Sequence, residues 1–560
     1  MPIESGTIRG RVDSALLDKA DRLFQNSDDS LWTELLQNAR RAGANSVEIT
    51  LQAAMGSSGR SVVTVWDNGV GIDDFQKLIT LGGSGWSNSV QYIEDPAGIG
   101  FFSLCRSDVT VQSGHRTVNI TPAVFLGREE ARIGIVEQYF QGTRLVFTRD
   151  SAVDSLKAAL ERATAFCPLA VKLNGALLPQ YDFLEGAAYR EQIDGIEIGF
   201  APEFEHNFGW SDQNWNFYGA RIREPFPSFD GIIVSEDRKP GSLHARFNVL
   251  ETGRVNLQLP DRRAVIQDRN FEKFVRKAKA AAYRFFQTLP RHALPYANWR
   301  EARELGVVLP EAAPLLHTWC PRPADDTMEP VFGPSELHIL SDLTKVWIMD
   351  RDTENQHTLA GALHSGSRVG GILYEARKQW EGYEWYQKLP RVAGCTVLID
   401  DLPSGEWPQG SSKRPDKIEL ELDILQSGKE KRRLRLPALV HVDESEGREI
   451  DFVAVRNSPW DNDDLAGPFS IVDFLMSACF CASDDSEADS WMTQRDNFAE
   501  EVEREVNAYF RGPKATLLAL LRKGIGWDAN RLATELGIHE IHFKRVASDA
   551  QQWEIELSLR

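Results

Sequence analysis

The segment that most restricts the fold runs from residue 61 to residue 71. Residues 61–66, Ser-Val-Val-Thr-Val-Trp, are rich in β-branched side chains and lead directly into Asp67-Asn-Gly69-Val-Gly71. β-Branched residues favour a strand, and the glycines allow a turn with positive φ. The pattern therefore predicts an acidic side chain held at the tip of a strand. Taken alone, Asp-Asn-Gly is most often an ordinary hairpin turn, so the neighbouring segments must decide its role.

A helix is predicted upstream, over residues 30–43, because apolar residues recur there at helical spacing. Ser30, which follows two aspartates, is a candidate N-cap. Glu34 and Asn38 are four residues apart, so they project from the same side of this helix, one turn from each other. A strand is expected next, over residues 46–51.

Two glycine-bearing motifs follow the Asp67 turn. Residues 82–97 are rich in Gly and Ser and indicate a loop, and Gly98-Ile-Gly100-Phe101 then opens an apolar, helix-like segment. Glycines at a helix N-terminus let backbone amides approach an anion, and the helix dipole favours phosphate there. A single Gly-x-Gly is weak support for such a site.

The last motif is Gly142-Thr143, which we expect to enter a further strand. The four motifs, in this order, resemble those of the GHKL ATPase superfamily, which includes DNA gyrase, the ninety-kilodalton heat-shock chaperones, histidine kinases and MutL. The family pattern is a Glu-x-x-x-Asn helix, an Asp-x-Gly-x-Gly strand end, a flexible lid, a Gly-x-Gly helix start and a Gly-Thr strand. Each motif is ambiguous by itself, whereas the ordered set is specific.

The resemblance implies a site for ATP and Mg²⁺. Asp67 would accept a hydrogen bond from the adenine amino group, with Thr143 assisting through its hydroxyl or a water molecule. Asn38 would complete the coordination of a magnesium ion held by the three phosphates. Glu34 would orient and deprotonate the attacking water, which makes it the candidate catalytic base.

The glycine motifs would bind the rest of the nucleotide. Gly69 and Gly71 are the expected contacts beside Asp67, and Gly98 and Gly100, followed by Phe101, would wrap the β- and γ-phosphates. The resemblance also implies that the lid near residues 82–97 closes only when the γ-phosphate supplies contacts, so that nucleotide state becomes a conformational signal.

The position of Glu34 and the segment Gly98 to Ser103 are most similar to the chaperone and MutL branches, which hydrolyse ATP. One position departs from the pattern, because Arg41 stands where relatives often carry an aspartate three residues after the asparagine. This substitution alters the charge near the nucleotide, so we expect hydrolysis to be slow.

Residues 151–300 resemble the second, transducer domain of the same family. A helix is predicted over residues 152–166, a hairpin at Asn174-Gly175 and an amphipathic helix over residues 271–285. This domain is expected to deliver a basic side chain to the γ-phosphate. Arg262 occupies the matching place and is the second candidate catalytic residue, with Lys239 as the alternative. Arg262 and Arg263 could equally be a solvated pair at a strand end.

Residues 301–560 carry no motif that we can name. Strands are predicted over residues 345–350, 396–400 and 418–423, and an apolar helix face over residues 498–509. This half is acidic, since Lys+Arg and Asp+Glu number 14 and 18 in residues 1–150, 20 and 18 in residues 151–300, and 29 and 46 in residues 301–560. The net charges are −4, +2 and −17, so acidity disfavours nucleic acid only for the last segment.

Composition also bears on location. The six cysteines are scattered and form no zinc framework, so reduced, mostly buried thiols are expected. The first residues are polar, and no stretch approaches about 18 uninterrupted apolar residues. We expect a cytoplasmic protein without a membrane segment.

These observations predict a mixed α/β and α+β multidomain protein. It would have an N-terminal Bergerat ATPase α/β sandwich (1–150), a transducer-like α/β middle domain (151–300) and an uncharacterised α+β C-terminal region with room for two subdomains (301–560). The expected function is an ATP-binding and hydrolysing switch that forms a homodimer on binding ATP. It would be a chaperone-like or assembly ATPase, acting on a protein client or on an effector from a neighbouring gene. The alternatives are a DNA-acting clamp in bacterial genome maintenance or antiviral defence, and an ATP sensor without significant turnover.

Overall fold

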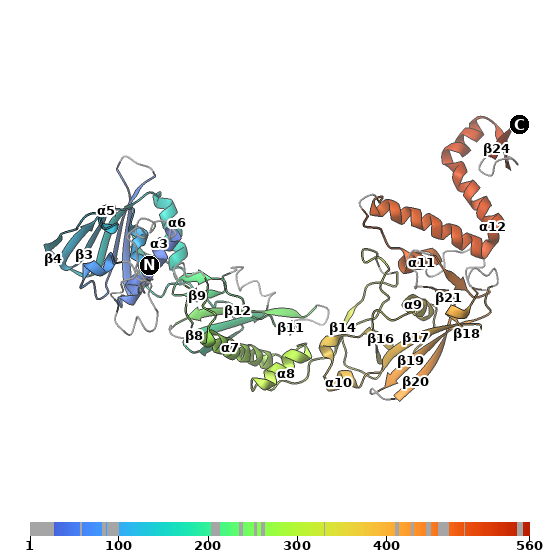
Figure 1. Ribbon diagram of the computed structural model, residues 1–560, viewed down its shortest axis with the longest axis horizontal. Helices are drawn as coiled ribbons and strands as arrows, with labels where there is room; N and C mark the ends of the chain where they lie inside the picture. Colours follow the sequence, from blue (N-terminus) through green and yellow to red (C-terminus); the bar gives the residue numbers. More distant parts are fainter. Residues whose placement is uncertain are drawn as a thin grey trace, which may run out of the picture. The chain divides into compact units, whose positions relative to one another are not determined.

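The computed structural model (Figure 1) describes most of the chain. The described residues are 27–55, 59–80, 86, 100–202, 213–233, 239–250, 255–258, 264–329, 331–408, 414–426, 430–443, 450–456, 458, 470–485, 488–545 and 553–559. The chain divides into two compact units, of residues 1–235 with 239–312, and of residues 236–238 with 313–560. Both units combine sheets and helices, which confirms the predicted mixed α/β multidomain class.

The first sheet has the strand order β3-β4-β2-β1-β5-β6. Its strands are β1 (Ser46–Ala53), β2 (Ser61–Asp67), β3 (Val109–Ile120), β4 (Ile133–Arg149), β5 (Ala170–Leu173) and β6 (Ala176–Leu177). Alternate residues of β1 and β2 are buried, so one face of the sheet supplies the core. The helical elements of this part are α3 (Asp28–Arg41), η1 (Phe75–Leu78), η2 (Gly100–Leu104), α5 (Pro122–Phe125) and α6 (Val153–Thr164).

Helix α3 packs against α6 and the core face of this sheet. Trp32 is completely buried, and its indole N–H donates to the carbonyl oxygen of Leu156 in α6 at 3.0 Å. The N-cap is Ser27, whose Oγ accepts from the backbone N–H of Ser30 at 3.2 Å, so the prediction of Ser30 as the cap was wrong. The helix starts earlier because Asp28 and Asp29 are favourable inside a first turn, where they face the positive end of the helix dipole.

The Gly-Thr motif lies inside β4 and not at the start of a strand, which corrects the sequence prediction. Thr143 pairs with Asp67 across the antiparallel β2–β4 ladder. Gly142 has a φ of +73°, and a Cβ atom there would lie 2.0 Å from the carbonyl oxygen of Asp67. Only glycine fits at this position, because any side chain would displace the backbone of β2.

The second sheet has the order β10-β9-β12-β8-β7, and β11 pairs with β12. Its strands are β7 (Tyr189–Ile193), β8 (Ile196–Pro202), β9 (Trp215–Phe217), β10 (Ala220–Ile222), β11 (Asp230–Ile232) and β12 (Gly241–Val249). Helices α7 (Arg269–Thr288) and α8 (Tyr296–Glu304) share its core. The predicted helix over 271–285 is thus present, as is the hairpin at Asn174-Gly175, where both residues have positive φ.

The third sheet lies in the second unit and has the order β16-β15-β17-β19-β20, with β18 paired to β17. Its strands are β15 (Val346–Met349), β16 (Ile372–Glu375), β17 (Arg391–Ile399), β18 (Leu402–Pro403), β19 (Ile418–Gln426) and β20 (Glu430–Ala438). Helix α9 (Gln356–His364) connects the parallel strands β15 and β16. All three strands predicted for this half are present.

Smaller elements complete the second unit. They are β13 (Leu315–His317), β14 (Leu337–Ile339), η4 (Lys378–Trp380), α10 (Glu384–Gln387), η5 (Ser404–Glu406), β21 (Val440–Val442), β22 (Phe452–Ala454), α11 (Ile471–Cys479), α12 (Trp491–Glu535), β23 (Ile538–Arg545) and β24 (Trp553–Leu559). Val502 and Val506 are fully buried on α12, as the predicted apolar face requires.

None of the described helices is both long enough and apolar enough to cross a membrane. None of the six cysteines forms a disulfide bond, and Cys481 alone among them is exposed.

A pair of glycine substitutions tests the close approach between β2 and β4. Gly142→Ala should lower the free energy of unfolding by about 2–4 kcal/mol, because it adds a steric clash to the cost of positive φ. Gly175→Ala is the matched control, since Gly175 has a φ of +87° but open space around its Cβ position. Gly175→Ala should lower the free energy of unfolding by only about 1 kcal/mol. Chemical denaturation of the full chain measures both, and equal effects would contradict the close approach.

Candidate functional site

Asp67 lies at the end of β2 with its carboxylate buried. One carboxylate oxygen accepts the backbone N–H of Gly69 at 2.9 Å and that of Thr143 at 3.3 Å. The residue is only 9% exposed, and burial raises the pKa of Asp67, while the hydrogen bonds from Gly69 and Thr143 partly oppose this shift. Two motifs that are far apart in the sequence therefore meet at a single carboxylate, as the resemblance implied.

Close packing leaves no room for a side chain at Gly69 or Gly71, the two glycines that follow Asp67. A Cβ atom on Gly69 would lie 2.7 Å from the Cβ atom of Ala42, at the end of α3. Gly71 has a φ of +80°, and its Cβ atom would lie 2.4 Å from the Oγ of Ser113. The turn is thus held between the C-terminal end of α3 and β3, where its backbone is fixed beside Asp67.

Ser113 is a part of this arrangement that the sequence analysis missed. Its hydroxyl donates to the carbonyl oxygen of Gly142 at 2.8 Å and accepts the backbone N–H of Ile72 at 2.8 Å. It is 3% exposed, so both hydrogen bonds are shielded from water. Ser113 ties the turn after β2 to β4. A serine within a strand has no sequence signature that distinguishes this role.

Glu34 projects from α3 toward the start of η2. A Cβ atom on Gly100 would lie 2.3 Å from the Oε2 of Glu34, so the carboxylate rests directly against the Gly100 backbone. The structure therefore brings the acidic residue of the first motif to the glycine of the third. Phe101 lies next to this contact and packs on Phe125, with ring centroids 5.5 Å apart, so it anchors η2 to the core.

Asn38 follows Glu34 by one helical turn, and its side chain contacts Arg41. The Nη1 of Arg41 donates to the Oδ1 of Asn38 at 3.3 Å, and the Nη2 of Arg41 donates to the Oε1 of Gln37 at 3.0 Å. The residue that departs from the family pattern therefore hydrogen-bonds the predicted magnesium ligand. This contact was not foreseen, because the sequence marked Arg41 only as a change in charge.

Four sequence predictions remain, of which three fall outside the described residues and the fourth concerns Lys239. Gly98 and Arg262 lie outside the described residues, and so does nearly all of the segment 82–97. Lys239, the alternative to Arg262, is exposed and lies just before β12.

The described residues fit a magnesium nucleotide in two respects. Gly100 and Gly142 let the backbone approach Glu34 and Asp67 more closely than any residue with a side chain would allow. Asn38 supplies a carboxamide oxygen, the hard type of ligand that Mg²⁺ prefers when phosphates occupy its other positions. Across the described part of the chain, no group of three or more His, Cys, Asp or Glu side chains could hold a metal ion by itself.

Comparison with known proteins gives distant structural similarity alone. No protein-family model and no curated protein matches the chain. The ATPase domain of Thermus thermophilus gyrase B, in complex with an aminocoumarin, is 18% identical over 31% of this chain and 56% of that chain, with a TM-score of 0.20. The chain thus spans just over half of that gyrase structure.

Two further solved structures show a similar degree of likeness. The topoisomerase IV ATP-binding domain of Francisella tularensis, in complex with a small-molecule inhibitor, is 12% identical over 52% of this chain and 94% of that chain, with a TM-score of 0.30. The N-terminal domain of a DNA repair protein is 12% identical over 49% of this chain and 98% of that chain, with a TM-score of 0.28. These TM-scores are too low for the similarity to carry an argument about function.

The buried Asp67 carboxylate should make stability depend on pH. Its pKa in the folded chain is raised above the ordinary value of 3.8, so the folded chain binds this proton more tightly than the unfolded chain. The contribution of Asp67 to the free energy of unfolding is therefore fully present below pH 3.8. It is lost as the pH rises through the raised pKa. Asp67→Asn should unfold at higher urea than wild type at pH 7, and the difference should shrink below pH 4.

The exposed Asp73 provides the control for this experiment, since Asp73→Asn removes the same charge near the same turn. An Asp67→Asn variant that is less stable than wild type at pH 7 would contradict the account of Asp67 as a carboxylate destabilised by burial.

Proposed function

We propose that this chain binds ATP with Mg²⁺ and hydrolyses it slowly, as a conformational switch of the GHKL type. The observation that carries the proposal is the junction at Asp67. A buried carboxylate at a strand tip, hydrogen-bonded from two distant glycine motifs, lies in the same domain as a second carboxylate that rests on a helix-start glycine. This combination supports a nucleotide pocket better than any other use of these residues.

In this proposal each residue has a distinct task. Asp67 accepts the adenine amino group and Thr143 assists it. Asn38 contributes its amide oxygen to Mg²⁺, which would supply charge neutralisation of the phosphates when bound. Glu34 holds the attacking water and takes its proton.

The glycines supply space and backbone donors. Gly69 and Gly71 shape the turn beside the base. Gly100, at the start of η2, and Gly98 offer amides to the phosphates. Arg262, or Lys239 in its place, would stabilise the charge that develops on the γ-phosphate from the middle domain. Such a contact would let ATP draw the domains of two chains together into a homodimer.

A second candidate is an ATP sensor without significant turnover. The hydrogen bond from Arg41 to Asn38 favours it, because a guanidinium beside the metal ligand opposes the binding of a cation there. The two functions share the pocket and differ in whether bound ATP is hydrolysed.

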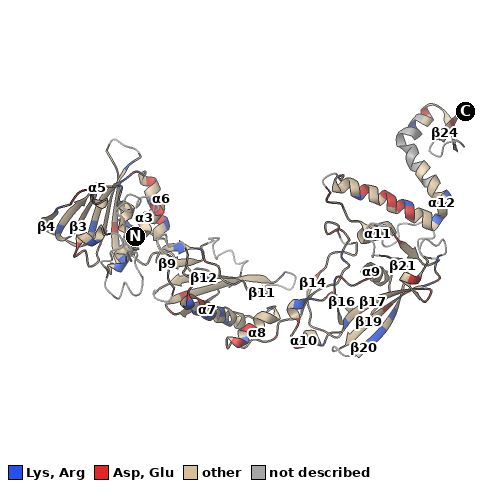
Figure 2. Cartoon of the chain, in the orientation of Figure 1, with Lys and Arg blue, Asp and Glu red and all other residues tan. Residues whose placement is uncertain are grey.

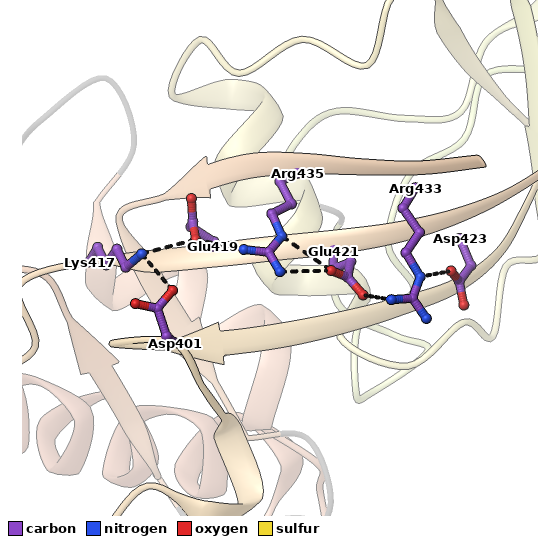
Figure 3. A network of polar contacts seen from close by, with 7 residues as sticks. All are labelled: Asp401, Lys417, Glu419, Glu421, Asp423, Arg433 and Arg435. Carbon is purple, nitrogen blue, oxygen red and sulfur yellow. Dashed lines mark hydrogen bonds and ion pairs between the residues drawn. The ribbon is translucent and has the colours of Figure 1, made fainter.

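The nature of the macromolecular partner is a separate part of the proposal. Lys and Arg gather along β20 (Figure 2), but neighbouring acids on β19 neutralise the central arginines (Figure 3). Arg433 pairs with Glu421 at 3.2 Å and with Asp423 at 3.3 Å, and Arg435 pairs with Glu421 at 3.2 Å. This face therefore gives no support to DNA binding, and a protein client or a neighbouring-gene effector stays the proposed partner. Buried free cysteines are compatible with a cytoplasmic location.

Glu34→Gln tests hydrolysis directly. Removing the general base while keeping the shape of the side chain should lower ATP turnover by about 100-fold or more and change ATP affinity by less than about threefold. Turnover is measured by phosphate release, and affinity by calorimetry. Glu48→Gln, at an exposed position on β1, is the matched control and should behave as wild type.

The results separate the two candidates. Binding of ATP by the wild type without measurable turnover would favour the sensor. Equal turnover by wild type and Glu34→Gln would remove Glu34 from the reaction.

A further inference from the structure

Helix α3, which carries Glu34 and Asn38, also contacts the second sheet of the same unit. Gln37 is 4% exposed, and its Nε2 donates to the carbonyl oxygen of Phe217, the last residue of β9, at 3.4 Å. The guanidinium of Arg40 lies 3.7 Å from the ring centroid of Tyr218, in the turn that follows. This is a cation–π contact of close geometry. One helix therefore bears the proposed catalytic base Glu34, the proposed magnesium ligand Asn38 and the contact to the β9–β10 hairpin.

The β9–β10 hairpin is rigid at this contact. Its turn residues have positive φ, +53° at Tyr218 and +100° at Gly219. The N–H of Gly219 donates to the Oδ1 of Asn216 at 2.9 Å, and the Nδ2 of Asn216 donates to the carbonyl oxygen of Phe166 at 3.1 Å. A Cβ atom on Gly219 would lie 2.8 Å from the carbonyl oxygen of Ala163 in α6. These contacts hold the turn in place, so a displacement of Phe217 moves the whole hairpin.

Arg41 links this contact to Asn38. Its guanidinium donates from one nitrogen to the Oδ1 of Asn38 and from another to the Oε1 of Gln37. The carboxamide of Gln37 accepts from Arg41 on one side and donates to Phe217 on the other. Three hydrogen bonds therefore connect the proposed magnesium ligand to the backbone of β9, and each bond in such a chain strengthens the next.

We infer that Arg41 is a positioning residue that couples occupancy of Asn38 to the β9–β10 hairpin, an inference that rests on the proposed binding of Mg²⁺ and ATP. When the Oδ1 of Asn38 takes up a cation, the guanidinium beside it is repelled and leaves. Gln37 then loses the hydrogen bond from Arg41, and its hold on Phe217 weakens. Because coupling is reciprocal, a docked hairpin opposes cation binding at Asn38.

Two measurements on the full chain test this inference. Calorimetry gives the Mg²⁺ concentration at which a non-hydrolysable ATP analogue is half-saturating, and amide hydrogen exchange follows residues 213–222. In the wild type, Mg²⁺ with the analogue should speed exchange of this segment. Arg41→Ala should need about threefold to tenfold less Mg²⁺, because no guanidinium competes at Asn38. Its hairpin should exchange quickly from the outset and should not respond to nucleotide.

Arg41→Lys separates the effect of the positive charge from that of the two hydrogen bonds to Asn38 and Gln37. It also tests the inference if the alanine variant folds poorly. Lysine keeps the positive charge but lacks the planar fork that reaches two acceptors at once. It should retain the Mg²⁺ requirement of the wild type and lose the nucleotide-dependent change in exchange. Arg60→Ala, which removes an exposed arginine before the first residue of β2, should match the wild type in both measurements.

Each result is decisive. An Arg41→Ala variant that needs as much Mg²⁺ as the wild type or more, or whose hairpin still responds to nucleotide, overturns the inference and leaves the proposed function intact. Failure of the wild type to bind the analogue at any Mg²⁺ concentration overturns the proposed function, and the inference with it.

Discussion

The buried carboxylate of Asp67 is the constraint on which the rest of the N-terminal domain depends. A charge without nearby donors would be costly there, so the backbone amides of Gly69 and Thr143 must point at it. That requirement brings β4 against the end of β2 and leaves room only for glycine at position 142. Ser113 then closes the arrangement by hydrogen-bonding Gly142 in β4 and Ile72 in the turn after β2. In the proposed function, the same carboxylate accepts the adenine amino group.

Helix α3 packs against the other side of this junction. Its C-terminal end packs on the turn after Asp67, since the N–H of Val70 donates to the carbonyl oxygen of Ala42 at 2.9 Å. Its middle presents Glu34 to Gly100. Its start is fixed by Arg149, which pairs with Asp28 at 3.1 Å from the far end of β4. A rigid helix held at both ends can transmit a change at Asn38 to the hairpin that it contacts.

Much of this arrangement could be predicted from the sequence, since helical spacing placed Glu34 and Asn38 together and the glycine motifs marked Asp67 as special. What could not be predicted depends on tertiary contacts. Ser113 has no local signature, and the bridge from Arg41 to Asn38 and Gln37 requires knowing which rotamers the second sheet allows. Both Ser27 and Ser30 have the side chain of a cap, and only the structure shows that Asp28 and Asp29 belong to the first turn. The buried strands of the second unit specify packing and not chemistry, so they carry no sequence motif for a site.

The most direct test compares the affinities of ATP and GTP for the full chain by calorimetry in the presence of Mg²⁺. Adenine presents an amino donor where guanine presents a carbonyl acceptor. The Asp67 carboxylate can only accept, so it should bind ATP at least about tenfold more tightly than GTP. Equal affinity for the two nucleotides, or tighter binding of GTP, would contradict the account of Asp67 as the residue that reads the base.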